Sequence, residues 1–198
     1  MPYLTKTASQ ISIVGNSIHD NVKHGWVSSA RHIHSPHFNT RPCGEVSLLV
    51  IHNISLPAGC FGLPYIDHLF MGCLNCEDDP SFADLDGLTV SAHFLIRRDG
   101  ELIQYVSCDD RAWHAGVSKF EARENCNDFA IGIELEGTDD IAYTEKQYGT
   151  LTHLSNTLMG VYPKLNKERI VGHCDIAPKR KTDPGNSFDW KRYLAGLI

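Results

Sequence analysis

The segment from Val46 to Asn53 constrains the fold more than any other part of the chain, because it is apolar on both faces and rich in β-branched residues. Such a run is typical of a central strand whose sheet is covered on both sides. The segment ends on a polar pair, His52 and Asn53. With 198 residues the chain is long enough for one sizeable core, so we expect a single domain.

Further segments are expected to join this strand in a sheet. Residues 89–97 and 101–106 flank the turn sequence Asp99-Gly100, which is the strongest β-hairpin signal in the chain. Residues 129–135 and 169–173 are short apolar runs of the kind that form buried strands. A hairpin combined with strands that helical segments separate indicates a mixed sheet.

Helical patterns lie between and after these strands. Residues 65–71 follow a proline and predict a short helix. Thr144 and Gln147 have the form of a capping box at the start of a longer helix. A last helix is expected near the C-terminus, with Asn186 or Ser187 as its cap. The fold class that follows is α/β (α+β), with a central mixed β-sheet flanked by helices.

Composition and charge exclude several classes of function. The formal net charge of −6 argues against nucleic-acid binding, which needs a basic face. No apolar run approaches the roughly 18 residues that a membrane span needs, and residues 1–25 are polar with no signal-peptide pattern. We therefore expect a cytoplasmic monomer with a polar extension over residues 1–25 and one domain over residues 26–198. The odd count of seven cysteines favours free thiols.

The stretch from Gly172 to Gly185 carries the strongest chemical signal. It contains His173, two aspartates (Asp175 and Asp183) and three cations that include Lys181. An imidazole and a carboxylate are ligands that bind a divalent metal and leave it Lewis-acidic, which suggests a zinc hydrolase. Spacing alone does not choose between the two aspartates. The basic run is ordinarily solvated, although an ammonium near a metal could stabilise an oxyanion.

Two other strand ends carry polar residues that could complete such a site. His52 ends an apolar strand, and its ordinary interpretation is a core histidine bonded to a carbonyl. Glu134 shares one strand face with Ala130 and Gly132, small residues that would leave room for a substrate or water beside its carboxylate. The alternative is a strand with one solvated face, which needs no function.

Other clusters could also suggest a metal site. Four histidines between residues 24 and 37 lack regular spacing and are interrupted by proline, which favours a surface loop. Cys73 and Cys76, with Cys60 or Cys43, could form a structural zinc module. That module lacks the second close pair of cysteines that such sites normally contain.

The segments that carry these residues resemble the type-2 zinc N-acetylmuramoyl-L-alanine amidases. The resemblance extends in order from about Trp26 to Trp190, and it implies one central mixed sheet flanked by helices. The matching blocks are Val50–Ser55, Ser91–His93, Ala112–Ser118, Ile131–Gly137 and Gly172–Gly185.

The resemblance also implies the roles of individual residues. The metal residues of the family fall on His52, His173 and Asp183, which leaves Asp175 outside the ligand set and implies one Zn²⁺ per chain. Glu134 matches the acid/base glutamate of the family, and Lys181 matches its catalytic lysine. The substrate contacts that we infer from the matching blocks are Asn53, His93, Ala112, Trp113 and His114.

The activity implied is hydrolysis of the amide bond between the lactyl group of (1,6-anhydro)-N-acetylmuramic acid and L-Ala of the stem peptide. That places a small muropeptide as the substrate, in cytoplasmic peptidoglycan recycling and, indirectly, in the control of β-lactamase induction. The alternative is a peptidoglycan-binding protein without turnover, because related recognition proteins keep the fold and lose a zinc ligand.

The chain departs from the enterobacterial pattern of this family at two positions. Where that pattern has arginines, which would face the carboxylates of the stem peptide, this chain has Thr89 and Asn125. Recognition of an acidic peptide would then be relaxed unless Arg97, Arg111 or Arg123 takes their place.

Overall fold

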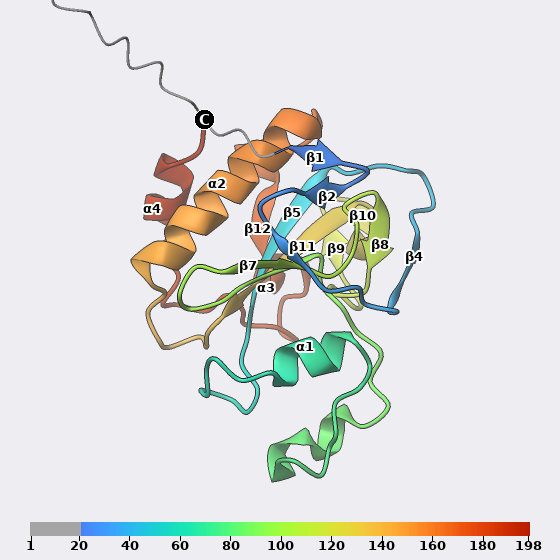
Figure 1. Ribbon diagram of the computed structural model, residues 1–198. Coiled ribbons are helices and arrows are strands. Elements are labelled where there is room, and N and C mark those ends of the chain that lie inside the picture. Colours follow the sequence, from blue (N-terminus) through green and yellow to red (C-terminus); the bar gives the residue numbers. More distant parts are fainter. Residues whose placement is uncertain (1–20) are drawn as a thin grey trace, which may run out of the picture.

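A six-stranded mixed sheet forms the centre of the protein in the computed structural model, which describes residues 21–198 (Figure 1). The strand order is β12-β5-β11-β6-β7-β3. The β6–β7 pair is antiparallel and the other four pairs are parallel, so the predicted mixed sheet is confirmed. The six strands are β3 (Arg31–His32), β5 (Leu48–Ile54), β6 (Phe94–Ile96), β7 (Leu102–Gln104), β11 (Ala130–Glu136) and β12 (Ile170–Gly172).

The two longest strands, β5 and β11, lie next to each other inside the sheet, as their apolar sequences predict. Every residue of β11 is buried. In the parallel register between them, Glu134 lies beside His52. On the other side of β5, Gly172 pairs with Ile51, so the next residue, His173, lies level with His52. The candidate site residues of these three strands therefore lie together at the C-terminal ends of the parallel strands.

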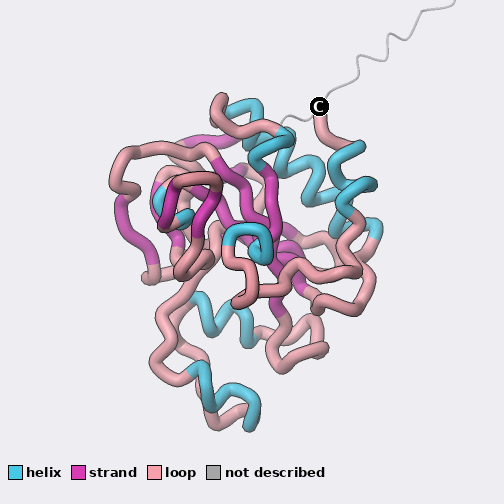
Figure 2. The backbone as a smooth tube through the Cα atoms, turned by 180° about the vertical axis from the view of Figure 1, so that it is seen from behind, coloured by secondary structure: helices cyan, strands magenta, loops and turns pink. Residues whose placement is uncertain are grey.

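One face of the sheet is covered by α2 (Glu145–Val161) and α4 (Trp190–Ala195), which lie side by side in both views (Figures 1 and 2). Thr144 and Gln147 form the predicted capping box at the start of α2. Leucines of α2 pack with alternate residues of β5 and β11 in the main hydrophobic core. The core residues from these three elements are Leu49, Ile51, Ile131, Ile133, Leu151, Leu154 and Leu158.

The opposite face is covered by shorter elements and forms the floor of the candidate site. Helix α1 (Tyr65–Phe70), which the sequence predicts, packs against residues of β6 and β7. Helix α3 (His173–Ile176) and Ala115 pack against Leu48 and Val50 of β5. Because side chains alternate along a strand, His52 points to the same face as Leu48 and Val50.

The structure decides between the two aspartates left open by the sequence, and two expectations for individual elements are wrong. The last strand ends at Gly172, which is the N-cap of α3, and Asp175 in the first turn of that helix accepts a hydrogen bond of 2.7 Å from the Gly172 N–H. Asp175 therefore does not lie on a continued strand beside His173. Helix α4 is capped by Asp189, not by Asn186 or Ser187.

The second wrong expectation concerns residues 111–127, whose polar sequence with Gly116 predicts one long loop. This segment contains several short elements, and the first of them pairs with β4 (Phe38–Thr40) to form a separate two-stranded sheet. These elements are β8 (Asp110–Ala112), β9 (Lys119–Phe120), β10 (Arg123–Glu124) and the 3₁₀ helix η2 (Cys126–Asp128). The acidic segment after Cys73 likewise contains a 3₁₀ helix, η1 (Pro80–Leu85), which buries Phe82.

The beginning of the chain is described from residue 21 onward. Strands β1 (Val22–Lys23) and β2 (Trp26–Val27) form a small antiparallel hairpin, and Val22 packs against the main core. The other twenty residues of the predicted N-terminal extension lie outside the described residues. Among the described residues, none of the helices has the length and apolar character needed to cross a membrane.

Candidate metal centre and active site

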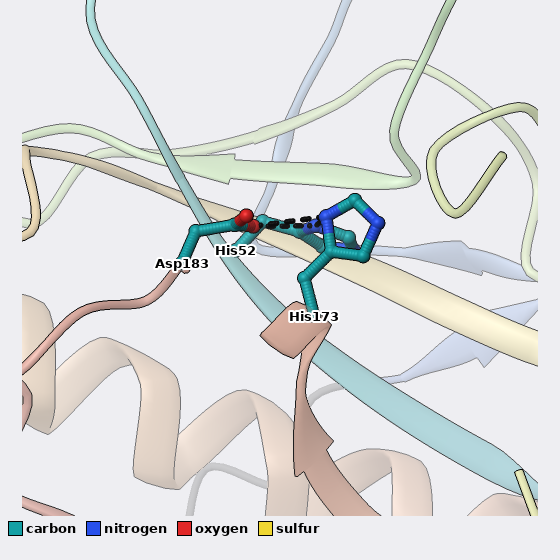
Figure 3. A group of neighbouring side chains, drawn as sticks. All are labelled: His52, His173 and Asp183. Carbon is teal, nitrogen blue, oxygen red and sulfur yellow. Dashed lines mark hydrogen bonds and ion pairs between the residues drawn. The ribbon is translucent and has the colours of Figure 1, made fainter. Parts of the chain in front are cut away.

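Three side chains from distant parts of the chain converge at the edge of the sheet (Figure 3). His52 comes from β5, His173 from the start of α3, and Asp183 from the loop that follows α3. The His52 Nδ1 atom lies 3.0 Å from His173 Nδ1 and 3.1 Å from Asp183 Oδ2. His173 Nδ1 lies 3.0 Å from the same Asp183 oxygen. Three potential ligand atoms therefore form a nearly equilateral triangle.

Both imidazoles turn Nδ1 toward this triangle because their other ring nitrogens have partners elsewhere. His173 Nε2 lies 3.1 Å from the carbonyl oxygen of Ala115, which can only accept, so Nε2 carries the proton. His52 Nε2 lies 2.9 Å from Nδ1 of His114. The Ala115 carbonyl oxygen fixes the tautomer of His173 and leaves its Nδ1 atom as an acceptor. In the His52–His114 contact, one of the two facing nitrogens carries the proton.

The charges of the group suit a divalent cation. Burial lowers the pKa of His52 to about 4, so this ring is neutral at neutral pH. Burial opposes ionisation of Asp183, but the adjacent imidazoles of His173 and His52 outweigh it and lower the pKa of the carboxyl group. A tetrahedral zinc ion with bonds of about 2.1 Å separates its ligand atoms by roughly 3.4 Å, close to the distances found here. The donor set therefore fits a zinc ion after only a small displacement.

No second cluster competes with this one in the part of the chain that the structure describes. His52, His173 and Asp183 form the one group of three or more potential ligands found among residues 21–198. The alternative of a structural zinc site built from Cys73 and Cys76 is therefore wrong for these residues. Cys43, Cys60, Cys73 and Cys76 are free thiols that are exposed or half-buried.

Glu134 lies beside His52 in the sheet and is 8% exposed. Burial, followed by the charge of Asp183, raises the pKa of Glu134 well above its usual value, while the Lys181 ammonium opposes the shift. Its Oε2 atom has no hydrogen-bond partner among the described residues. A buried carboxyl oxygen without a partner is costly, and such an atom is suited to bind a group that the protein does not itself supply.

The space next to Glu134 differs from the sequence expectation. A Cβ atom on Gly132 would lie 2.5 Å from the ring of His114, so this glycine accommodates the imidazole and leaves no open room there. The Nε2 atom of His114 is buried and, like Glu134 Oε2, has no partner among residues 21–198. His114 thus lies over the floor of the site and bonds directly to His52.

A cavity of about 540 Å³ opens next to the triangle of ligands. Asn53, Lys181 and Asp183 contribute to its lining. A predicted substrate contact, the predicted catalytic lysine and a predicted metal ligand therefore border the same cavity. The Asn53 amide donates a hydrogen bond of 2.8 Å to Asp139, which also lines the cavity. Sequence reasoning overlooked Asp139, because it lies in a polar turn with no periodic pattern.

The other predicted substrate contacts differ in accessibility. Trp113 is half-buried and stacks on His37 at a ring separation of 6.0 Å. His93 and Ala112 are completely buried. His93 accepts the Gly132 N–H at Nδ1, and its Nε2 atom lies 3.1 Å from the Asp110 carbonyl oxygen. The structure therefore places His93 behind the site floor, where it supports the strand that carries Glu134.

None of the three arginines considered as substitutes for the missing cations is free. Arg97 pairs with Asp67 and Glu136, and its side chain is 10% exposed. Arg111 pairs with Asp128, and Arg123 pairs with Glu45. Their charges are therefore already compensated inside the protein.

The chain is similar to known amidases over most of its length. The family model of N-acetylmuramoyl-L-alanine amidase matches residues 41–186. The 1,6-anhydro-N-acetylmuramyl-L-alanine amidase AmpD of Escherichia coli (strain K12) is 56% identical over 173 residues, which cover 87% of this chain and 94% of that protein. A crystal structure of a selenomethionine AmpD derivative superposes with a TM-score of 0.88 at 55% identity, covering 90% of this chain and 99% of that one.

A more distant structure contains a bound substrate. It is the E. coli amidase AmiD in complex with anhydro-N-acetylmuramic acid-L-Ala-D-γ-Glu-L-Lys, and it shares 26% identity with a TM-score of 0.56. The match covers 90% of this chain and 65% of AmiD. The family match, the close relatives and the shared fold lead to one conclusion: the chain belongs to the N-acetylmuramoyl-L-alanine amidase family of enzymes.

Proposed function

We propose that this protein is a zinc-dependent amidase that cleaves the bond between the lactyl group of 1,6-anhydro-N-acetylmuramic acid and L-Ala of the stem peptide. The observation that carries the proposal is the convergence of His52 Nδ1, His173 Nδ1 and Asp183 Oδ2 at 3.0–3.1 Å, beside the buried Glu134 carboxyl group. The substrate class is supported by the printed activity of the AmpD relatives and by the ligand in the AmiD structure.

In this proposal His52, His173 and Asp183 hold one Zn²⁺ per chain. When bound there, the ion supplies Lewis acidity for the amide carbonyl and acidifies the attacking water. Glu134 accepts the proton of that water and returns it to the departing alanine nitrogen. The Lys181 ammonium donates to the oxygen that becomes negatively charged in the transition state.

The substrate would lie along the cavity that borders the ligands. Asn53 and Lys181 line it, and the His114 Nε2 atom is a buried group without a partner in the described chain. We propose that Asn53, His114 and Trp113 contact the muropeptide, while His93 and Ala112 shape the floor beneath it. Since Arg97, Arg111 and Arg123 are all paired, we propose a broader tolerance for the charge of the stem peptide.

The setting follows from the same proposal. A cytoplasmic monomer with residues 26–198 as the amidase domain would act in peptidoglycan recycling and thereby affect β-lactamase induction, without nucleic-acid or membrane partners. Residues 1–25 would form an extension outside the catalytic unit, although residues 22–27 pair in a hairpin.

The test is a mass-spectrometric turnover assay with anhydromuropeptides and intact sacculi as parallel substrates, with and without a chelator. We expect release of the stem peptide from anhydromuropeptide, loss of release in chelator, and restoration by zinc. The alternative function, muropeptide binding without turnover, would show binding but no release in added zinc. This chain has a potential ligand residue at all three positions, His52, His173 and Asp183, which favours the enzyme.

A further inference from the structure

The side chain of Asn127 binds two consecutive backbone amides beside the candidate metal centre. Its Oδ1 atom accepts the N–H of His114 at 3.1 Å and the N–H of Ala115 at 2.8 Å. Because both partners are backbone donors, the atom that faces them must be the amide oxygen. Asn127 lies in η2, directly before the strand that carries Glu134.

The two residues held by Asn127 are the outer partners of the two histidines in the ligand group. Nδ1 of His114 lies 2.9 Å from Nε2 of His52. The carbonyl oxygen of Ala115 lies 3.1 Å from Nε2 of His173. One acceptor atom therefore fixes the short segment that contacts both rings on the side opposite their Nδ1 atoms, which face Asp183.

The position of Asn127 is itself secured by a buried cation. Arg41 is 3% exposed and forms no ion pair within the described part of the chain. It donates to the carbonyl oxygens of Asn127 at 3.1 Å and Ala130 at 2.9 Å, on either side of the junction between η2 and β11. These hydrogen bonds, with one of 3.1 Å to the Cys108 carbonyl oxygen, compensate for burial of the guanidinium and hold the junction in place.

We propose that Asn127 is a positioning residue for the metal centre, acting through His114 on His52 and through Ala115 on His173. The inference rests on the proposed function for the identity of the metal. Loss of the Asn127 oxygen would free both outer partners together, so the effect should appear in metal affinity before any chemistry occurs. Substitution of outer partners typically weakens metal binding by about 10- to 100-fold.

The test measures the zinc dissociation constant of the full-length protein by competition with a chromophoric chelator. Asn127→Leu removes the acceptor with little change in volume, and we expect zinc binding about 10- to 100-fold weaker than in the parent protein. Asn127→Asp retains an oxygen at the same position, and we expect it to restore most of the affinity. Asn166→Leu is the matched control. The side-chain oxygen of Asn166 accepts a backbone N–H as well, but it caps the distant η3 helix (Lys167–Arg169).

A second readout separates positioning from a loss of folding. With Co²⁺ in place of zinc, the visible absorption bands report ligand geometry, and we expect them to shift in Asn127→Leu and not in Asn166→Leu. If the leucine variant does not fold, Asn127→Ser, which shortens the acceptor arm, should weaken zinc binding in the same direction. Parent-like zinc affinity in a folded leucine or serine variant, or equal losses in Asn127→Asp and Asn127→Leu, would overturn the proposal. A protein that binds zinc but releases no peptide would refute the proposed function and leave this inference intact.

Discussion

The Nδ1 atoms of His52 and His173 lie 3.0 Å apart, although 121 residues separate the two histidines in the chain. His173 donates its Nε2–H to the Ala115 carbonyl oxygen, so in the neutral ring Nδ1 is the acceptor that faces this contact. Two neutral acceptor nitrogens and a carboxylate at such distances repel one another unless a cation or shared proton lies between them. The stability of the folded protein around this site therefore depends on whether a cation or a proton lies between these three atoms.

The first prediction concerns the choice between the two aspartates of the loop. Asp183→Ala should abolish zinc binding at micromolar concentration and reduce peptide release to background, because it removes one of three ligands. Asp175→Ala removes only the hydrogen bond to the Gly172 N–H at the start of α3, and it should cost about 0.5–1.5 kcal/mol of stability while zinc binding persists. Metal content after gel filtration and thermal unfolding measure the two effects. Full zinc content in Asp183→Ala would contradict the ligand assignment.

The sequence predicts the parts of this fold that depend on periodicity and caps. Strands β5 and β11 are continuous apolar runs, and α2 begins with a capping box, so local pattern and tertiary structure agree. The short strands β8, β9 and β10 have two or three residues each and show no period that could reveal them. Their existence depends on partners elsewhere in the chain.

The same limit applies to the site. The meeting of His52 and Glu134 follows from parallel strand ends, which the sequence indicates. The choice of Asp183 over Asp175 depends on how the loop folds back, and spacing does not encode that path. The Asn127 contacts with residues 114 and 115 join two irregular segments, so no pattern in either segment reveals them.

The second prediction concerns the free energy of unfolding of the metal-free protein with Glu134→Gln. Burial raises the pKa of Glu134 above its usual 4.5, so the folded state binds this proton more tightly than the unfolded state. The wild-type protein is therefore destabilised as pH rises above about 4.5, and the glutamine variant escapes that loss. We expect the variant to be more stable at pH 7, with the difference vanishing below pH 4.5. Peptide release should fall by about 10²–10⁴-fold.

Glu136→Gln is the control for this experiment and should act in the opposite direction. Glu136 lies two residues farther along the same strand, is 1% exposed and pairs with Arg97 at 3.1 Å. Its oxygens also accept the N–H groups of Gly62 and Arg98. Replacement of one oxygen by an NH₂ group should lower the free energy of unfolding by about 1–3 kcal/mol. Chemical denaturation at several pH values compares the two variants, and a less stable Glu134→Gln protein at neutral pH would contradict the prediction.

The third prediction tests whether His114 must remain on the site floor. In Gly132→Ala the new methyl group would lie 2.5 Å from the His114 ring, so the ring must move and its bond to His52 must break. We expect zinc binding about 10-fold weaker or worse, together with about 1–3 kcal/mol of lost stability from overpacking. Chelator competition and thermal unfolding provide the two measurements.

Gly149→Ala provides the matched control for Gly132→Ala. Gly149 lies inside α2, and a methyl group added to it would meet no atom of a neighbouring element within 4 Å. Alanine there should stabilise the protein by about 0.5–1 kcal/mol and leave zinc binding unchanged. Equal zinc affinity in both alanine variants would show that the His114 ring position does not matter for the metal.

The last prediction separates Lys181 from its neighbour Lys179, since both are exposed cations of the same loop. Lys181 lines the cavity beside Asp183 and its charge reaches Glu134, whereas Lys179 is not among the residues that line this cavity. Lys181→Ala should lower kcat by about 10²–10³-fold, the typical loss of one oxyanion donor, while zinc content stays complete. Lys179→Ala should leave kcat within about twofold, because an exposed charge outside the cavity contributes little. Steady-state kinetics on anhydromuropeptide with metal analysis of each variant decide the assignment, and similar kcat values for the two variants would remove Lys181 from the chemistry.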